Sequence, residues 1–574
     1  PSKWSAETPT LYTAVLDLGD DLGGELVSHR VGFRKVEIKG RVFMVNGQPV
    51  KLKGANRHEM NPNTGHHVTE ADMIEDLKML KRANCNHVRT SHYSNDPRWY
   101  ELCDEWGIYL VAEANAECHG LYDVLDREPR FERMVVDRNR ANVENFKNHP
   151  SVLIWSMGNE CGGGSNMRKA EEVVRTMDPS RPTHYESFGE GANNPAGIDS
   201  HMYTQPDDLE RIANDATLTK PMYLCEYAHA MNNSMGSIGD YNDLFDKYPA
   251  LMGGAIWEWQ DQGLWNRRDP KRPYLAYGGG FGDKPNDQYF IHKGVVFADR
   301  SPKPHFPEVK RAYQWISFRD LGDGKIAVKN RFAFTDLSKY SLKWTVTSDS
   351  GVLTTGTMPL SSVTPGEEKT MVLALPKVKA KPGTTYYLNL AAVLRAPERW
   401  AERGWEIANA QFPLPVAEST LVQAPKGDLE IDRAPDGGVE IKGAGFGLTF
   451  DRATGTLSQM SEKGRNLLSP GGGPQLHLWR AQHRNDDAWA ARGWAVNGLA
   501  DLQREVLDLR VEKGRAGGAV VSSSVRYTGK NGFTALHLAR YTVYGDGTVA
   551  VDNAVSPSGR NIALARMGVR MLLD

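Results

Sequence analysis

The sequence predicts a multidomain α/β plus all-β protein with a central (β/α)8 barrel. Between residues 37 and 316, eight short apolar runs alternate with loops or helical stretches, and eight β/α units over about 250–280 residues are what such a barrel requires. Beyond residue 320 the helical pattern fades into period-2 strands punctuated by Pro and Gly, which indicates β-sandwiches. The 574 residues allow roughly three to four domains at about 150 residues each.

The predicted β domains lie on both sides of the barrel in the chain order. Residues 1–36 alternate apolar and polar side chains in LYTAVLDL and ELVSHRVGF, as the last strands of a small β domain would. The barrel occupies residues 37–316. Residues 317–418 predict one β-sandwich, and residues 419–574 predict a second, larger β domain that stops at Asp574 without a recognisable closing element.

The clearest unit of the barrel is TEADMIEDLKMLKRANCNHVRTSHY, which begins at Thr69. Thr69 can cap a helix together with Asp72, three residues further on. Met73, Leu77 and Leu80 then fall on one face at helical spacing, and NHVRTSHY follows as a strand. The sequence repeats this plan with the helix-like DPRWYELCDEWG and the strand-like IYLVAEAN.

Eight segments are candidate barrel strands, each followed by a loop or a helix. Their apolar runs suit strands that are covered on both faces. They comprise residues 50–59, 86–92, 108–115, 151–160, 181–187, 198–203, 222–229 and 253–259.

Polar side chains end these strands. SVLIWSMGNECGGG, residues 151–164, runs from a buried strand into a glycine-rich turn that carries Glu160. A single glutamate there is most often a solvated loop residue, but the carboxyl ends of barrel strands meet at one mouth, where barrels keep their chemistry. Eight strands that all end in polar or aromatic residues favour a functional mouth. The residues are Arg57, His58, Glu59, Arg89, His92, Glu113, Glu117, His119, Asn159, Glu160, Glu186, His201, Tyr203, Glu226, His229, Trp257 and Glu258.

The composition excludes several classes of partner. The net charge is −2 and no block of Lys and Arg stands out, so nucleic acid and anionic membranes are not expected partners. No apolar run approaches the ~20 residues of a membrane-spanning helix. The five cysteines form no CxxC pair, which favours free thiols in a reducing compartment such as the cytoplasm. The chain opens with Pro1 and shows no leader, so a periplasmic or secreted location stays open.

Two of the strand-end carboxylates suit glycoside hydrolysis. Glu160 follows the fourth strand and Glu226 ends the seventh in YLCEYAHAM, and these strands face each other across a barrel mouth. The reaction needs one acid to protonate the leaving oxygen and one carboxylate to meet an oxocarbenium-like carbon. A separation of about 5–5.5 Å between them would make such an enzyme retaining.

Six motifs carry a specific resemblance: KGANRHEMNPNTG, VRTSHYSNDPRWYELCDEWGIYLVAEANAECHG, NHPSVLIWSMGNECGGGSN, LCEYAHAMNNSMG, GGAIWEWQDQGL and YGGGFGDKPNDQYF. Together they resemble the bacterial β-galactosidases of glycoside hydrolase family 2. The resemblance implies that Glu160 is the general acid/base and Glu226 the nucleophile. It also implies immunoglobulin-like β-sandwiches on both sides of the barrel and a large terminal β-sandwich. Against that pattern we expect a fragment that lacks the N-terminal jelly-roll sugar-binding domain and the end of the terminal sandwich.

The resemblance further implies a Mg²⁺ cofactor in the mouth. Its ligands would be Glu117 and His119 of ECHG together with Glu160, and a site with three protein ligands and several waters suits magnesium. By spacing alone, Glu117 and His119 favour a solvated loop. In PNDQYF, Asn286 matches a second, looser Mg²⁺ site, and Phe290 matches a carbonyl that faces a monovalent cation such as Na⁺.

Other residues match sugar-binding and transition-state positions of the family. Arg89 would hold the nucleophile ionised, and His58 and His92 would stabilise the transition state. From the residues alone, Trp257 is equally well a core aromatic of the eighth strand. The sugar-contacting matches are His92, Tyr203, His229 and Trp257, and Asn159 completes the substrate-binding set.

One position departs from the family pattern. In the enterobacterial type, an asparagine three residues after the phenylalanine of PNDxxF helps to bind a Na⁺ that touches the sugar's 6-hydroxyl, whereas FIHKG places Lys293 there. Lys293 either points to solvent, as most lysines do, or its ammonium occupies the cation site and donates to the sugar hydroxyl. The second alternative would leave no role for Na⁺.

The predicted function is retaining exo-β-galactosidase action on lactose-like β-galactosides, in a homo-oligomer when the enzyme is complete. A β-glucuronidase or β-mannosidase of the same family is the alternative within the enzyme class. A glucuronidase would need a cationic clamp for the sugar carboxylate near the mouth, and RHEMNPNTG resembles galactosidases instead. A non-catalytic carbohydrate-binding protein would be expected to have lost Glu160 or Glu226, and both are present.

Overall fold

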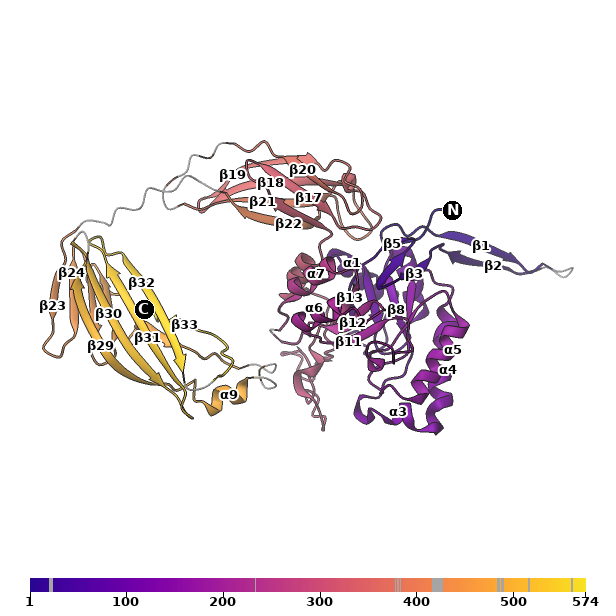
Figure 1. The fold of residues 1–574 in the computed structure, drawn as a ribbon, viewed down its shortest axis with the longest axis horizontal. Coiled ribbons are helices and arrows are strands. Elements are labelled where there is room, and N and C mark those ends of the chain that lie inside the picture. The colour runs from indigo at the N-terminus through magenta and orange to yellow at the C-terminus, as the bar shows by residue number, and fades with distance from the viewer. Residues whose placement is uncertain are drawn as a thin grey trace. The chain divides into compact units, whose positions relative to one another are not determined.

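The computed structural model divides the chain into two compact units, which are drawn as a ribbon in Figure 1. The first unit comprises Pro1–Val378 with Thr385–Pro415, and the second comprises Lys379–Thr384 with Val416–Asp574. The predicted domain boundaries within these units stay a prediction. The residues that the structure describes are 1–19, 24–232, 234–376, 378, 381, 384–414, 427–482, 486, 490–514, 517–558 and 561–574.

The first unit contains a nearly closed barrel of eight parallel strands, so all eight predicted strands are confirmed. The strand order is β10-β9-β8-β7-β6-β13-β12-β11. Seven of the eight strands, all except β11, are buried along their whole length, as expected of strands covered by helices outside and by side chains inside. The bounds are β6 Leu52–Arg57, β7 His87–Thr90, β8 Tyr109–Glu113, β9 Val152–Ser156, β10 Thr183–His184, β11 Asp199–Met202, β12 Met222–Tyr227 and β13 Leu251–Ile256.

Helices cover the outside of the barrel (Figure 1). The predicted cap of the first one is confirmed: Thr69 and Asp72 form a capping box, and Met73, Leu77 and Leu80 are buried against the strands. The helices of this unit are α1 Glu70–Arg82, α2 Pro97–Trp106, α3 Val124–Arg127, α4 Glu132–Phe146, α5 Ser165–Met177, α6 Pro206–Asn214, α7 Ile238–Lys247 and α8 His305–Ala312. Short two-residue strands β14 (Trp265–Asn266) and β15 (Tyr274–Leu275) pair in the long connection that follows β13.

The N-terminal segment forms strands, as its alternation predicts. The antiparallel pair β1 (Tyr12–Asp17) and β2 (Leu26–Val31) is exposed on both strands. Side chains such as Val15 and Leu26 are 60% and 68% exposed. Three further short strands, β3 Val36–Lys39, β4 Val42–Val45 and β5 Gln48–Pro49, form a small antiparallel sheet next in the chain.

The first unit ends in a two-sheet sandwich, as predicted for this region. One sheet has the order β16-β17-β20 and the other β19-β18-β21-β22. Residues such as Ile326, Leu342 and Leu390 are buried in one core between them. The bounds are β16 Ile316–Asp320, β17 Lys325–Asn330, β18 Tyr340–Ser348, β19 Gly351–Pro359, β20 Glu368–Val372, β21 Tyr386–Leu394 and β22 Glu406–Pro413.

The second unit consists mainly of antiparallel sheets, as predicted. A five-stranded sheet, β23 to β27, and a four-stranded sheet, β29 to β32, share a core in which Phe450 packs edge-on against Tyr541. The bounds are β23 Glu430–Arg433, β24 Val439–Gly443, β25 Phe446–Asp451, β26 Thr456–Glu462, β27 Arg465–Asn466, β28 Gln475–His477, α9 Ala491–Val496, β29 Gln503–Lys513, β30 Ala519–Thr528, β31 Thr534–Val543, β32 Val549–Ser558 and β33 Gly568–Arg570.

Two chain-wide expectations can be compared with the structure. All five cysteines are free, and four of them are buried. In the part of the chain that the structure describes, no helix has both the length and the apolar character needed to cross a membrane.

Candidate active site

Arg89 on β7 lies at the centre of a hydrogen-bond network in the barrel mouth. Its guanidinium is fully buried and donates to Glu113 Oε2 at 2.6 Å, to Asn159 Oδ1 at 2.6 Å and to Glu226 Oε1 at 3.2 Å. These partners come from β8, from the turn after β9 and from β12. One cation therefore fixes the relative positions of three strand ends.

Glu226 is a buried carboxylate with a donor on each oxygen. Tyr203, which follows β11, donates its hydroxyl to Oε2 at 2.6 Å, while Arg89 occupies Oε1. Burial raises the pKa of Glu226 to about 8, and the charge of Arg89 and the Tyr203 hydrogen bond act against that rise. The two donors hold the carboxylate in a fixed orientation, which suits a nucleophile.

The glycine-rich turn after β9 carries Glu160 into the mouth. The turn is anchored because Asn159 N donates to Ala116 O at 2.8 Å and Glu160 N donates to Glu186 Oε1 at 2.8 Å. Glu160 has a φ of 46°, in the left-handed region that costs a non-glycine residue free energy. Its side chain is 25% exposed. The acid is thus held on an ordered turn yet reaches solvent, which suits a group that exchanges protons.

The predicted magnesium ligands lie beside Glu160. His119 Nδ1 is 3.5 Å from Glu160 Oε2, and His119 N donates to Glu117 Oε1 at 3.3 Å. Glu117 Oε2 is buried without a hydrogen-bond partner among the described residues. Burial raises the pKa of Glu117, and the nearby carboxylates Glu113 and Glu160 add to the rise. This carboxylate therefore lacks the positive partner that a buried charge requires.

The donor set fits a hard divalent cation, although the side chains do not converge on one point. Among the residues that the structure describes, no group of three or more His, Cys, Asp and Glu side chains could hold a metal ion as arranged. The His119 side chain is 76% exposed, so it can turn toward the two carboxylates. Two carboxylates, one of them with an unpartnered oxygen, and one imidazole match the chemistry of Mg²⁺ with several bound waters.

His58, His92 and Trp257 form an aromatic wall of the mouth. The His92 ring stacks on Trp257 with centroids 5.0 Å apart and planes at 16°, and His58 packs edge-on against both. Burial lowers the pKa of both histidines well below its ordinary value, so both imidazoles are neutral near pH 7. His92 Nδ1 lies 2.8 Å from Glu113 Oε1, which fixes its ring.

Lys293 lies inside the mouth, so the solvent-facing alternative is wrong. Its side chain is 7% exposed, and Nζ lies 3.2 Å from Glu258 Oε1. The ammonium is 5.6 Å from the Trp257 ring centroid and 5.5 Å from that of Phe290. Burial, followed by the charge of Lys293, lowers the pKa of His229 to about 4. Lys293 therefore faces the other predicted sugar-binding side chains.

Tyr203, His229 and Phe290 extend this wall. The His229 ring centroid lies 6.0 Å from that of Tyr203 and 5.9 Å from that of Phe290. Asn286 is placed differently, because it is exposed and its hydrogen bonds lie within its own loop, to Asp283 O and from Gln288 N. The contacts of Asn286 therefore do not link it to the other predicted site residues.

The sequence identifies several residues of the network only as polar side chains at strand ends and assigns them no role. Glu113 accepts from Arg89 and from Ser156 Oγ, each at 2.6 Å, and Glu258 partners Lys293. Glu186 supports the Glu160 turn, and burial raises the pKa of Glu186 to about 7. Their place at the ends of β8, β10 and β13 is the signal that could have identified them.

The fold and this site define a class, that of (β/α)8-barrel glycoside hydrolases. Residues 36–318 match the family described as "Glycosyl hydrolases family 2, TIM barrel domain". Residues 326–415 match "Beta-galactosidase, domain 4", and residues 442–574 match "Beta galactosidase small chain". The chain belongs to glycosyl hydrolase family 2.

Two curated relatives illustrate the similarity. The chain is 37% identical to a protein named beta-galactosidase from Priestia megaterium, covering 100% of this chain and 56% of the relative. It is 39% identical to one from Alteromonas mediterranea, covering 89% of this chain and 52% of the relative. The chain thus spans about half the length of these relatives. A crystal structure of a family 2 β-galacturonidase from Eisenbergiella tayi is 25% identical, with a TM-score of 0.45 and 54% of this chain and 59% of that chain covered.

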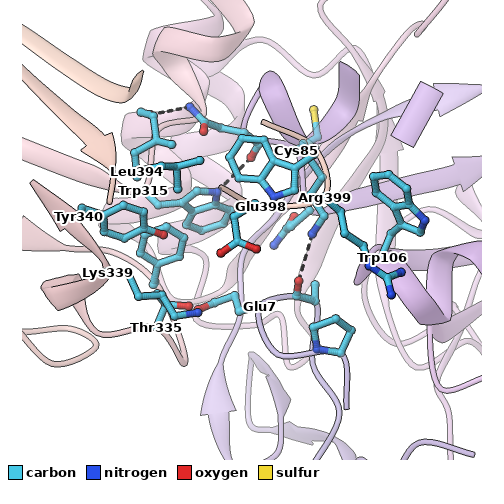
Figure 2. Close-up of a pocket in the computed structure, with 18 of the residues that line it drawn as sticks. Glu7, Cys85, Trp106, Trp315, Thr335, Lys339, Tyr340, Leu394, Glu398 and Arg399 are labelled. Carbon is cyan, nitrogen blue, oxygen red and sulfur yellow. Dashed lines mark hydrogen bonds between the residues drawn. The ribbon is translucent and has the colours of Figure 1, made fainter. Parts of the chain in front are cut away.

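A cavity of about 340 Å³ lies elsewhere in the first unit. It is lined by Cys85 and Trp106, which precede β7 and β8, so it lies at the amino-terminal ends of the barrel strands, opposite the mouth. In Figure 2 the carboxylate of Glu398 lies beside Trp315. None of the predicted site residues is among those that line this cavity.

Proposed function

We propose that the complete enzyme is a retaining exo-β-galactosidase that hydrolyses terminal β-D-galactosyl residues of lactose-like substrates. The observation that carries the proposal is Glu226, a buried carboxylate held on both oxygens by Arg89 and Tyr203. A residue fixed in this way is set up to form a bond to a carbon rather than to exchange protons with solvent. Two relatives that are 37% and 39% identical to this chain are both named beta-galactosidase, which supports the galactoside assignment.

The reaction proceeds in two displacements. Glu226 attacks the anomeric carbon with a lone pair as the glycosidic C–O bond breaks, and Glu160 transfers its proton to the leaving oxygen. The products of this half are a glycosyl ester of Glu226 and the free aglycone. Glu160, now a carboxylate, accepts a proton from water as the water oxygen attacks the same carbon and displaces Glu226.

The remaining side chains orient the sugar. Trp257 offers an apolar face, and the neutral imidazoles of His58, His92 and His229 exchange hydrogen bonds with hydroxyl groups. The Lys293 ammonium has three donors, and with Glu258 beside it, it replaces a monovalent cation. In this proposal the sugar needs no Na⁺ at the Phe290 carbonyl.

Glu117, His119 and Glu160 would hold Mg²⁺, and Asn286 would contribute to a second, looser site. When bound, the cation would supply positive charge beside the proposed acid/base. His119 Nδ1 lies 3.5 Å from the Glu160 carboxylate on one side, and on the other side Glu186 accepts a hydrogen bond from the Glu160 backbone N–H.

A panel of nitrophenyl glycosides tests the proposal in the complete enzyme. We expect the β-galactoside to be hydrolysed with a much higher kcat/KM than the β-glucoside, β-glucuronide or β-mannoside, with the β-anomer of galactose as the first product by NMR. An α-product would contradict retention. Equal rates on glucoside and galactoside would contradict the substrate assignment.

A uronidase is the second candidate, and Lys293 is the observation that favours it. A glycosidase for acidic sugars needs a cation that faces the sugar carboxylate, and Lys293 places one in the mouth. The β-galacturonide is therefore included in the panel. A preference for the galacturonide over the galactoside would move the assignment to this second candidate.

A further inference from the structure

Glu258 and Lys293 form an ion pair that is fixed by both backbone and side chains. Glu258 N donates to Lys293 O at 2.9 Å, and Val295 N donates to Glu258 O at 2.9 Å. The side chains meet at 3.2 Å, with Glu258 fully buried. Gln262 Nε2 lies 2.8 Å and 3.0 Å from the two Glu258 oxygens and donates to them. The carboxylate thus cannot turn away from the ammonium without losing several contacts.

The charge of Lys293 acts on the mouth rather than on solvent. The ammonium lies 5.6 Å from the ring centroid of Trp257 and 5.5 Å from that of Phe290. It helps to lower the pKa values of His58, His92 and His229. These three histidines come from different strand ends, so the space into which Lys293 faces is the space that the sugar would occupy.

The ion pair carries no net charge, and this neutrality favours binding of an uncharged sugar over binding of an acidic one. Two titratable groups face Glu258. Asp261 lies 3.0 Å from its own partner Lys303, and His58 Nε2 lies 3.7 Å from Glu258 Oε2. An ammonium whose charge is matched by a fixed carboxylate can still donate to a neutral hydroxyl with its remaining N–H bonds. A second carboxylate, brought in by an acidic sugar, would meet the repulsion of Glu258 at close range.

We infer that Glu258 is a specificity-determining positioning residue, which makes Lys293 select a sugar with a neutral hydroxymethyl group over the same sugar with a carboxylate. The inference rests on the proposed function in assuming that the sugar occupies this mouth. Without the charge of Glu258, Lys293 becomes an uncompensated buried cation, which is stabilised when an anion binds beside it. Without Lys293, the uncompensated Glu258 repels an anion.

Two substitutions test the inference because they move selectivity in opposite directions. Glu258→Gln keeps the shape and the Gln262 contact, and it is expected to raise the ratio of kcat/KM for the nitrophenyl β-galacturonide over the β-galactoside by at least about tenfold. Lys293→Met is expected to lower the same ratio. In the Lys293→Met background, Glu258→Gln should no longer raise the ratio above that of the wild type.

Equilibrium binding of galactose and galacturonate by calorimetry gives a second readout that needs no turnover. Circular dichroism and thermal melting verify that each variant is folded, and Lys293→Met still tests the inference if Glu258→Gln does not fold. A ratio that is unchanged or lower in Glu258→Gln, or unchanged in Lys293→Met, overturns the inference. Absence of galactoside hydrolysis by the wild type would overturn the proposed function instead, while the binding ratios still decide the role of Glu258.

Discussion

Arg89 Nη1 lies 3.2 Å from Glu226 Oε1, and the same guanidinium donates to Asn159, the residue that precedes Glu160. The proposed nucleophile and the turn that carries the proposed acid/base are therefore positioned by one buried cation. This arrangement links the orientation of Glu226 to its ionisation, since a cation that fixes a carboxylate also favours its charged form.

The first prediction concerns the ionisation of Glu226. In the proposed mechanism Glu226 attacks only as a carboxylate, so kcat/KM should rise with pH through its pKa, which burial raises to about 8. Tyr203→Phe removes a donor to the charged form and should move this acid limb to higher pH by about one to two units, since hydrogen bonds to charged groups contribute about 1.5–3 kcal/mol. The measurement is the pH profile of kcat/KM.

Tyr248→Phe is the matched control for this experiment. Tyr248 also donates to a carboxylate at 2.6 Å, but its partner is Glu210, outside the barrel mouth. We expect its profile to overlay that of the wild type. An acid limb that stays in place or moves to lower pH in Tyr203→Phe would contradict the role of Tyr203.

The second prediction separates the two carboxylates by leaving group. Glu160→Gln should retain much of the rate on dinitrophenyl galactoside, whose leaving group needs little protonation, and should lose lactose hydrolysis. Glu226→Gln should lose both, because no glycosyl ester can form. Equal proportional losses on both substrates in the two variants would show that the roles are assigned wrongly.

The third prediction concerns magnesium. Exhaustive chelation should lower the rate and added Mg²⁺ should restore it, while His119→Ala should raise the Mg²⁺ concentration needed because one ligand is lost. Calorimetric titration with Mg²⁺ checks binding independently of turnover. His67→Ala, another exposed histidine, serves as the control. An enzyme that is indifferent to chelation would remove Glu117 and His119 from the site.

The fourth prediction concerns sodium. Because the Lys293 ammonium already lies beside Glu258, rates in sodium, potassium and a bulky organic cation should be equal at one ionic strength. Lys293→Asn should introduce a dependence on sodium. Strong activation of the unmodified enzyme by sodium would show that Lys293 does not replace the ion.

The fifth prediction concerns the stability of the barrel. Thr69 caps α1 through Asp72 N, so Thr69→Ala should lower the free energy of unfolding by about 1 kcal/mol in urea. Thr176→Ala is the control, because the Thr176 hydroxyl only bonds back to Glu172 O within α5 and no cap is lost. Equal effects of the two substitutions would mean that the cap does not stabilise the native state.

The barrel could be predicted because its signals are local. Apolar runs with strand length, helices with caps such as Thr69 and polar residues at strand ends all lie within short stretches of sequence. Arg89, Glu226 and Tyr203 came together because the carboxyl ends of parallel strands share one edge. The chemistry of the mouth therefore follows from the order of the strands.

The burial and the partners of individual side chains could not be predicted, because they depend on contacts between distant segments. In the sequence, Lys293 is typical of a lysine in an exposed loop. It is a buried cation only because it approaches Glu258, which lies 35 positions earlier in the chain. Asn286 belongs to the same loop, yet its side chain is used within that loop. The exposure of the β1 and β2 strands is likewise invisible in their alternation, because a period of two does not say which face is covered.

Backbone hydrogen bonds join Glu258 to the segment that carries Lys293, and this pairing separates two proposed tasks, hydrolysis and sugar discrimination, between different parts of the barrel. In the proposed mechanism, bond making and breaking rely on β7, β9 and β12, whereas Trp257 and the Glu258–Lys293 pair belong to the end of β13 and the connection after it. If the pair discriminates between sugars as inferred, substitutions in that connection would change the sugar preference and leave the residues proposed for hydrolysis unchanged. Diversification within such a lineage would be concentrated in one contiguous stretch of the gene.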